Sequence, residues 1–226
     1  ADQLDCFFWR SRDCLIDEVR IGAKHEGGFS TSFAIRCERT TDIEIQLGLV
    51  TSDARLREFQ LSAIRSGPEI LVFADSRGLA PAAQIGMTHQ ETYVTAEKDL
   101  VGPALHNWTL LVERLWPYFF DVFKSPLTVA HFCLGAVPLE LQDILKRDPT
   151  SIAACGGHVK RFLFGAILFG LERKFEEAEL ALKYFSAATE SQYGNERGRA
   201  VELIDARRYT ALVGQWLQIR RGSDGK

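Results

Sequence analysis

The chain has 226 residues, a formal net charge of −3 and a hydrophobic share of 46%. This composition is typical of a globular protein with one large or two small cores, and the small charge excludes bulk attraction to nucleic acid or to an anionic membrane. The five cysteines include no Cys-x-x-Cys pair, which indicates thiols in a reducing compartment. We therefore expect a cytoplasmic protein that binds neither a membrane nor nucleic acid.

The first part of the chain is predicted to be one helix followed by strands. Residues 3–21 place apolar side chains at helical spacing between charged ones, which predicts an amphipathic helix. Two strand-like runs follow at 30–37 and 42–50, and the alternation in the second run favours an antiparallel hairpin. The apolar run EILVFA at 69–74 predicts a buried strand, and the Gly-, Ala- and Pro-rich residues 75–90 are typical of a loop.

From residue 98 onward the apolar pattern becomes helical. Pro117 interrupts the longest segment and should kink it, because proline lacks the N–H that a helix interior requires. Pro126 and Pro138 precede two shorter segments, as is common at the first turn of a helix. The helices predicted besides the hairpin described next are 104–116, 118–123, 127–134, 139–145 and 196–220.

The clearest pattern in the chain lies in residues 158–188, which predict two helices joined by a tight polar turn. The first helix is apolar nearly all round and should be buried, so we expect Gly165 and Gly170 to mark close approaches of neighbouring helices. Its apolar run, 162–171, is too short to span a bilayer. The spacing around the turn resembles a tetratricopeptide-type hairpin, but a solenoid needs about three copies and this sequence contains one.

Strands followed by helices predict an α+β fold. We expect a helix with a small antiparallel sheet in residues 1–97 and an all-helical half, with the tetratricopeptide-like hairpin, in residues 98–226. The boundary is expected between residues 81 and 102. The pattern leaves open whether the two halves share one core as a continuous compact unit.

Two pairs of potential ligands, His131 with Cys133 and Cys155 with His158, make up a set that zinc could bind. Residues two apart on a helix point to different sides, so the first pair is better explained by one packed and one exposed helix residue. Cys155 precedes a helix, a place where a thiol can be nucleophilic, but a catalytic cysteine also needs a base held by a third group. We therefore interpret it as a structural thiol and expect neither a metal nor a cofactor.

A second candidate site consists of the carboxylates Asp42, Glu44 and Asp75. An acidic residue and an E-x-Q strand can hold Mg²⁺ when two or three carboxylates converge on it, as in metal-dependent nucleases. Asp75 directly follows an apolar strand, where α/β enzymes often carry a carboxylate. The simpler interpretations are the solvent face of an alternating strand and a β-turn. A metal-dependent nuclease or hydrolase that uses these residues remains the alternative function.

The predicted amphipathic helix is followed by a Gly28-Phe29 pair with Phe33, by a strand at 43–49 and by an E-E-A hairpin at 171–182. In this order they resemble a bacterial α+β family of unknown function, from which the helices of residues 98–150 depart. Some members of that family look like immunity proteins that are encoded beside polymorphic toxins. The resemblance supplies no catalytic residues.

The sequence contains no G-x-G-x-x-G, no G-x-x-x-x-G-K-[ST], no H-E-x-x-H and no G-x-S-x-G motif. We therefore expect a protein-interaction module, of which an immunity-type inhibitor of a toxin is the more specific form. Its partner protein is expected to contact an exposed acidic or aromatic patch with about 800 Å² of surface on each side.

Overall fold

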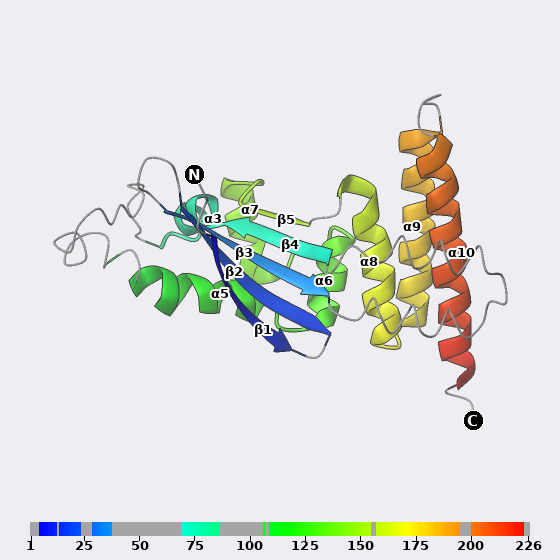
Figure 1. Ribbon diagram of the computed structural model, residues 1–226, viewed down its shortest axis with the longest axis horizontal. Helices are drawn as coiled ribbons and strands as arrows, with labels where there is room; N and C mark the ends of the chain where they lie inside the picture. Colours follow the sequence, from blue (N-terminus) through cyan, green and yellow to red (C-terminus); the bar gives the residue numbers. More distant parts are fainter. Residues whose placement is uncertain are drawn as a thin grey trace. The chain divides into compact units, whose positions relative to one another are not determined.

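The computed structural model describes two compact units, each of which combines segments far apart in the sequence (Figure 1). The described residues are 5–12, 14–23, 29–37, 69–85, 106, 109–154, 157–194 and 200–223. The boundary expected between residues 81 and 102 falls largely outside them, so the division at residue 97 stays a prediction. Within the described residues, no helix is both long and apolar enough to cross a membrane.

The first unit is built around a sheet whose five strands follow the order β1-β2-β3-β4-β5. β1 is an edge strand, because β2 is its only neighbour among the described strands. The strands predicted at 30–37 and 69–74 are confirmed as β3 and β4, whereas the run 42–50 lies outside the described residues. The bounds of the strands are Asp5–Arg12, Leu15–Ala23, Phe29–Cys37, Glu69–Asp75 and Ile152–Ala154.

The N-terminal helix predicted for residues 3–21 is wrong, because β1 and β2 form an antiparallel hairpin in which Arg10 lies opposite Asp17. Leu15, Asp17 and Val19 lie on one face of β2 and the residues between them on the other, so the true period is two. The alternation is hidden in the sequence because a charged residue, Asp17, takes an inward position and is only 3% exposed.

Aromatic side chains join the sheet to the helices of the first unit. The ring of Phe33 on β3 lies 5.6 Å from that of Phe119 and 6.2 Å from that of Phe120, measured between ring centroids. Phe33 and Phe119 are fully buried, and the tilted and edge-to-face arrangements are those that aromatic pairs prefer. The helical segments of this unit are α3 (Ser76–Ala82), η2 (Leu111–Leu115), α5 (Trp116–Val122) and α7 (Leu139–Arg147).

The path from η2 into α5 runs through a widened helical turn. The backbone N–H of Trp116 donates to the carbonyl of Leu111, five residues back, which is the π-helical spacing. Pro117 follows in the first turn of α5, where its missing N–H is tolerated. The predicted continuation of the helix beyond Pro117 is therefore confirmed. The loop predicted for residues 75–90 is partly wrong, because it contains α3.

The second unit contains the predicted helical hairpin, formed by α8 (Gly157–Leu171) and α9 (Phe175–Tyr193). The bounds of its other described helices are Pro126–Cys133 for α6 and Ala200–Ser223 for α10. The α+β class is confirmed. The C-terminal half is not wholly helical, however, because residues 152–154 form strand β5.

Two glycines of α8 mark close approaches, as predicted. A Cβ atom built on Gly165 would lie 2.5 Å from the Cδ1 atom of Leu134, and one built on Gly170 would overlap the ring of Trp216. Trp216 is fully buried. Both approaches lie inside the second unit, and the rigid ring at Gly170 leaves less room for a side chain than the flexible leucine at Gly165.

Candidate functional site

A hollow of about 340 Å³ lies in the first unit between the β1–β2 hairpin and the η2–α5 segment. Phe8 and Val19 are cross-strand partners, as are Arg10 and Asp17, and both pairs line the hollow. Residues two apart on one strand point to the same face of the sheet, and so do their cross-strand partners. The other lining residues are Trp9, Val112, Trp116, Pro117, Phe120 and Asp121.

The wall of the hollow is largely apolar and continues onto the surface. The rings of Phe8 and Trp116 lie 6.4 Å apart between centroids. Phe8 is nevertheless 54% exposed, Trp9 is 71% exposed and Val112 on η2 is 46% exposed. We call these three residues the aromatic edge. Exposed large apolar side chains that gather beside a hollow are typical of a binding surface.

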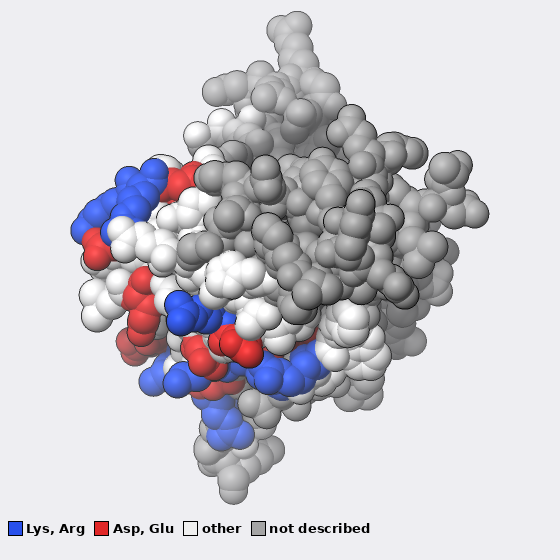
Figure 2. Space-filling view, turned by 90° about the vertical axis from the view of Figure 1, so that its left-hand side faces the viewer, with Lys and Arg blue, Asp and Glu red and all other residues white. Residues whose placement is uncertain are grey.

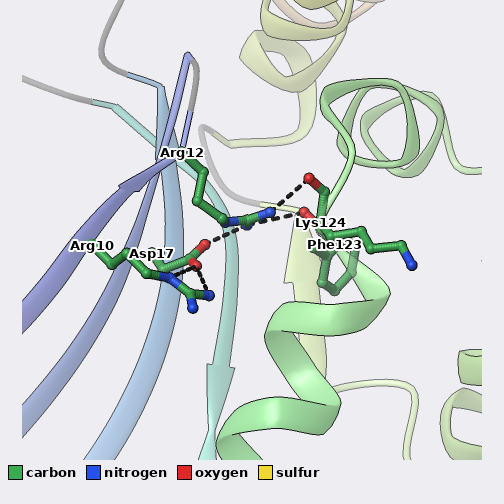
Figure 3. A network of polar contacts seen from close by, with 5 residues as sticks. All are labelled: Arg10, Arg12, Asp17, Phe123 and Lys124. Carbon is green, nitrogen blue, oxygen red and sulfur yellow. Dashed lines mark hydrogen bonds and ion pairs between the residues drawn. The ribbon is translucent and has the colours of Figure 1, made fainter.

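A charged network supports one end of the hollow (Figure 3). The Nε and Nη2 atoms of Arg10 donate to one oxygen of Asp17, over 3.1 and 2.6 Å, and Nη2 of Arg12 donates to the other oxygen. Asp17 therefore has both oxygens held by guanidinium groups. A buried carboxylate requires such partners, because an unpaired charge in the interior is strongly unfavourable.

Arg12 also fastens the hairpin to the end of α5. Its Nη1 atom donates to the carbonyl of Lys124 over 2.6 Å, and its Nη2 atom donates to the carbonyl of Phe123 over 3.2 Å (Figure 3). These carbonyls follow the last turn of α5, where backbone acceptors have no helical partner and a positive charge is favourable. The network thus fixes the two walls of the hollow against each other, which is a positioning role.

Sequence reasoning missed this site because its parts are distant in the chain and because the apolar spacing of residues 3–21 also fits a helix. Arg10 and Arg12 are two residues apart, as strand residues on one face are. Two arginines with this spacing, followed after a tight turn by an acidic residue that can pair with them across the hairpin, are the signal that could have revealed the network.

The alternative carboxylate site stays a prediction. Asp42 and Glu44 lie outside the described residues. Asp75 is the last residue of β4, so it follows the apolar strand as expected, and its side chain lies outside the described part of the chain.

The residues of the predicted zinc set are only partly described. His131 and Cys133 both lie on α6, His131 exposed and Cys133 fully buried, as the helical interpretation predicted. The His131 ring packs edge-on against Phe169, 5.0 Å between centroids. Cys155 lies outside the described residues, as does the side chain of His158. Among the residues that the structure describes, no group of three or more His, Cys, Asp or Glu side chains could hold a metal ion.

Within the described part of the chain, the hollow and its aromatic edge therefore form the best-defined candidate site. Comparisons of the chain with protein-family models, with curated proteins and with solved structures found no match.

Proposed function

We propose that this chain is a non-enzymatic protein-interaction module that binds a partner protein through the aromatic edge. The observation that carries the proposal is the exposure of Phe8 and Trp9, 54% and 71%, on the outermost strand of the sheet. Tryptophan, other aromatic residues and arginine are enriched at the centres of protein interfaces and contribute most of their binding energy. Arg10 lies beside both aromatic residues on β1.

The distribution of charge supports a protein partner. On the face drawn in Figure 2, basic and acidic side chains lie next to one another among uncharged residues, and neither sign covers a large area of the described surface. Nucleic-acid-binding surfaces instead gather Lys and Arg in a patch or stripe. Mixed charges around an apolar centre are the usual composition of a protein interface.

The more specific proposal is an immunity-type inhibitor that acts in the bacterial cytoplasm on a toxin. Its support is the resemblance in residues 28–33, 43–49 and 171–182, whereas the amphipathic helix with which members of that family start is a β-hairpin in this chain. The described cysteines with buried side chains, Cys14 and Cys133, are thiols, which agrees with a reducing compartment. Co-expression with the product of the adjacent gene tests this proposal: the chain should restore growth, and failure to restore it with every neighbouring gene product would refute the toxin assignment.

The general proposal is tested with a partner identified by cross-linking and then purified. Phe8→Ala and Trp9→Ala should each weaken its binding about 10- to 100-fold, as truncation of interface hot spots does. Leu139→Ala is the matched control, because Leu139 is an 81% exposed apolar residue on α7 of the same unit and lies outside the hollow. Equal binding by all three variants would refute the assignment of the surface.

A further inference from the structure

The side of β1 that no described strand covers offers backbone hydrogen bonds as well as side chains. In an antiparallel pair, every second residue of a strand turns its N–H and C=O groups away from its partner. β1 has eight residues and no neighbour except β2 among the described strands, so these groups form a row along its outer side. An extended segment of another chain can pair with such a row.

The side chains of β1 define what that segment should carry. Phe8 and Arg10 share the strand face of Val19 and Asp17, and Trp9, between them, has the opposite register although it also lines the hollow. A segment paired with β1 would therefore present residues i and i+2 on the side of the hollow and residue i+1 beside Trp9. The volume of about 340 Å³ is at the lower end of ligand sites, which suits one large apolar side chain.

Arg10 determines which charge is favourable at residue i+2 of the bound segment. Its Nε and Nη2 atoms donate to Asp17, while its Nη1 atom has no hydrogen-bond partner in the described part of the chain and its side chain is 66% exposed. Among the residues that line the hollow, Arg10 is basic and Asp17 and Asp121 are acidic, so a carboxylate of the segment is favourable only beside the exposed guanidinium of Arg10. Asp121 on the α5 wall is exposed, and its negative charge disfavours a carboxylate of the bound segment near that wall. The acidic residue of the segment is therefore expected beside Arg10.

We infer that the partner binds as an extended segment that adds a strand to β1, with an apolar side chain in the hollow and an Asp or Glu two residues away against Arg10. This inference rests on the proposed function and specifies how the aromatic edge is covered. The main-chain pairing supplies general affinity, and the apolar-x-acidic pattern supplies sequence preference.

The probe that tests this inference is a phage-displayed library of random linear peptides, selected on the full chain. The enriched peptides should share the apolar-x-acidic pattern. N-methylation of successive residues in a selected peptide should abolish binding at alternate positions only, because only every second N–H meets β1. Selection without this pattern, no enrichment at all, or N-methyl effects without a period of two would each overturn the inference.

Two variants of the chain test whether the selected peptide binds at the hollow. Arg10→Gln should weaken a peptide with Asp or Glu about tenfold and leave its Asn or Gln counterpart unchanged, because only the charged pair is lost. Val112→Lys places a charged chain at the apolar wall and should weaken both peptides, whereas the control Leu139→Ala should weaken neither. Circular dichroism verifies that each variant is folded.

Different results would refute the proposed binding surface and the proposed strand addition. If the partner protein depends on Phe8 and Trp9 but the peptides show no alternate N-methyl pattern, the strand-addition mode is wrong and the proposed surface stands. If the partner protein is insensitive to Phe8 and Trp9, the proposed surface is wrong as well.

Discussion

Replacement of Asp17 by Asn should reveal how much of the stability of the first unit depends on the network beneath the hollow. The side chain of Asp17 is 4% exposed and that of Arg12 is 18% exposed, so Asn would leave the Arg12 guanidinium largely buried without its counter-ion. Removing one member of a buried pair costs about 3–5 kcal/mol. Asp17→Asn and Arg12→Ala should therefore each lower the free energy of unfolding by about that amount.

Arg10 provides the matched comparison, because it binds the same carboxylate from an exposed position. Its side chain is 66% exposed, so water solvates the guanidinium with or without Asp17. Arg10→Ala removes two hydrogen bonds from the buried carboxylate of Asp17 but leaves the one from Arg12, so it should cost about 1–2 kcal/mol, less than Arg12→Ala.

Urea denaturation, followed by tryptophan fluorescence and by circular dichroism, measures these differences. The double variant Arg12→Ala/Asp17→Asn should lose less than the sum of the single losses, because the two residues share one interaction. High salt should reduce the effect of Arg10→Ala more than that of Arg12→Ala. The reasoning is refuted if Arg10→Ala destabilises as much as Arg12→Ala, or if Asp17→Asn costs less than about 1 kcal/mol.

Three further predictions concern single positions. Gly170→Ala in α8 should destabilise the protein by about 1–3 kcal/mol, because the added methyl group overlaps a tryptophan ring. Gly214→Ala in α10 should stabilise it by about 0.5–1 kcal/mol, because a Cβ atom there meets nothing within 4 Å. Thermal melts that rank the two variants the other way would contradict the packing. Arg173 has φ of 59°, so Arg173→Gly should raise the urea midpoint, and a lowered midpoint would argue against the left-handed turn. Hydrogen bonds from the side chain and backbone of Thr150 hold the pKa of Asp148 below its usual range. Their contribution to stability is present above the unfolded-state pKa and is lost as the pH falls through the folded-state pKa. Thr150→Val should raise the pKa of Asp148 in an NMR titration, and an unchanged pKa would refute the assignment.

Local patterns were sufficient for the elements whose side chains follow one period. α8 is apolar nearly all round, and its hairpin with α9 follows from spacing alone. The strand EILVFA is short, apolar and preceded by Gly67-Pro68, so it was also recognisable. Among the described side chains of these elements, none of the charged ones is fully buried, so the apolar pattern stays visible.

The N-terminal hairpin and the candidate site could not be predicted in the same way. Asp17 occupies an inward position because two arginines neutralise it, and a single sequence does not show which charges are paired. Phe8 meets Trp116, and Arg12 meets Lys124, through contacts that span more than a hundred residues. Such contacts depend on tertiary packing, which local periodicity does not encode.

The two glycine contacts of α8 have a consequence for how the second unit can vary. Gly170 lies against the ring of Trp216 in α10, whereas Gly165 lies against the terminal methyl group of Leu134, which directly follows α6, so an added side chain is harder to accommodate at Gly170 than at Gly165. In a saturation mutagenesis experiment, α8 should form the least tolerant stretch of this unit, and Gly170 should tolerate fewer substitutions than Gly165.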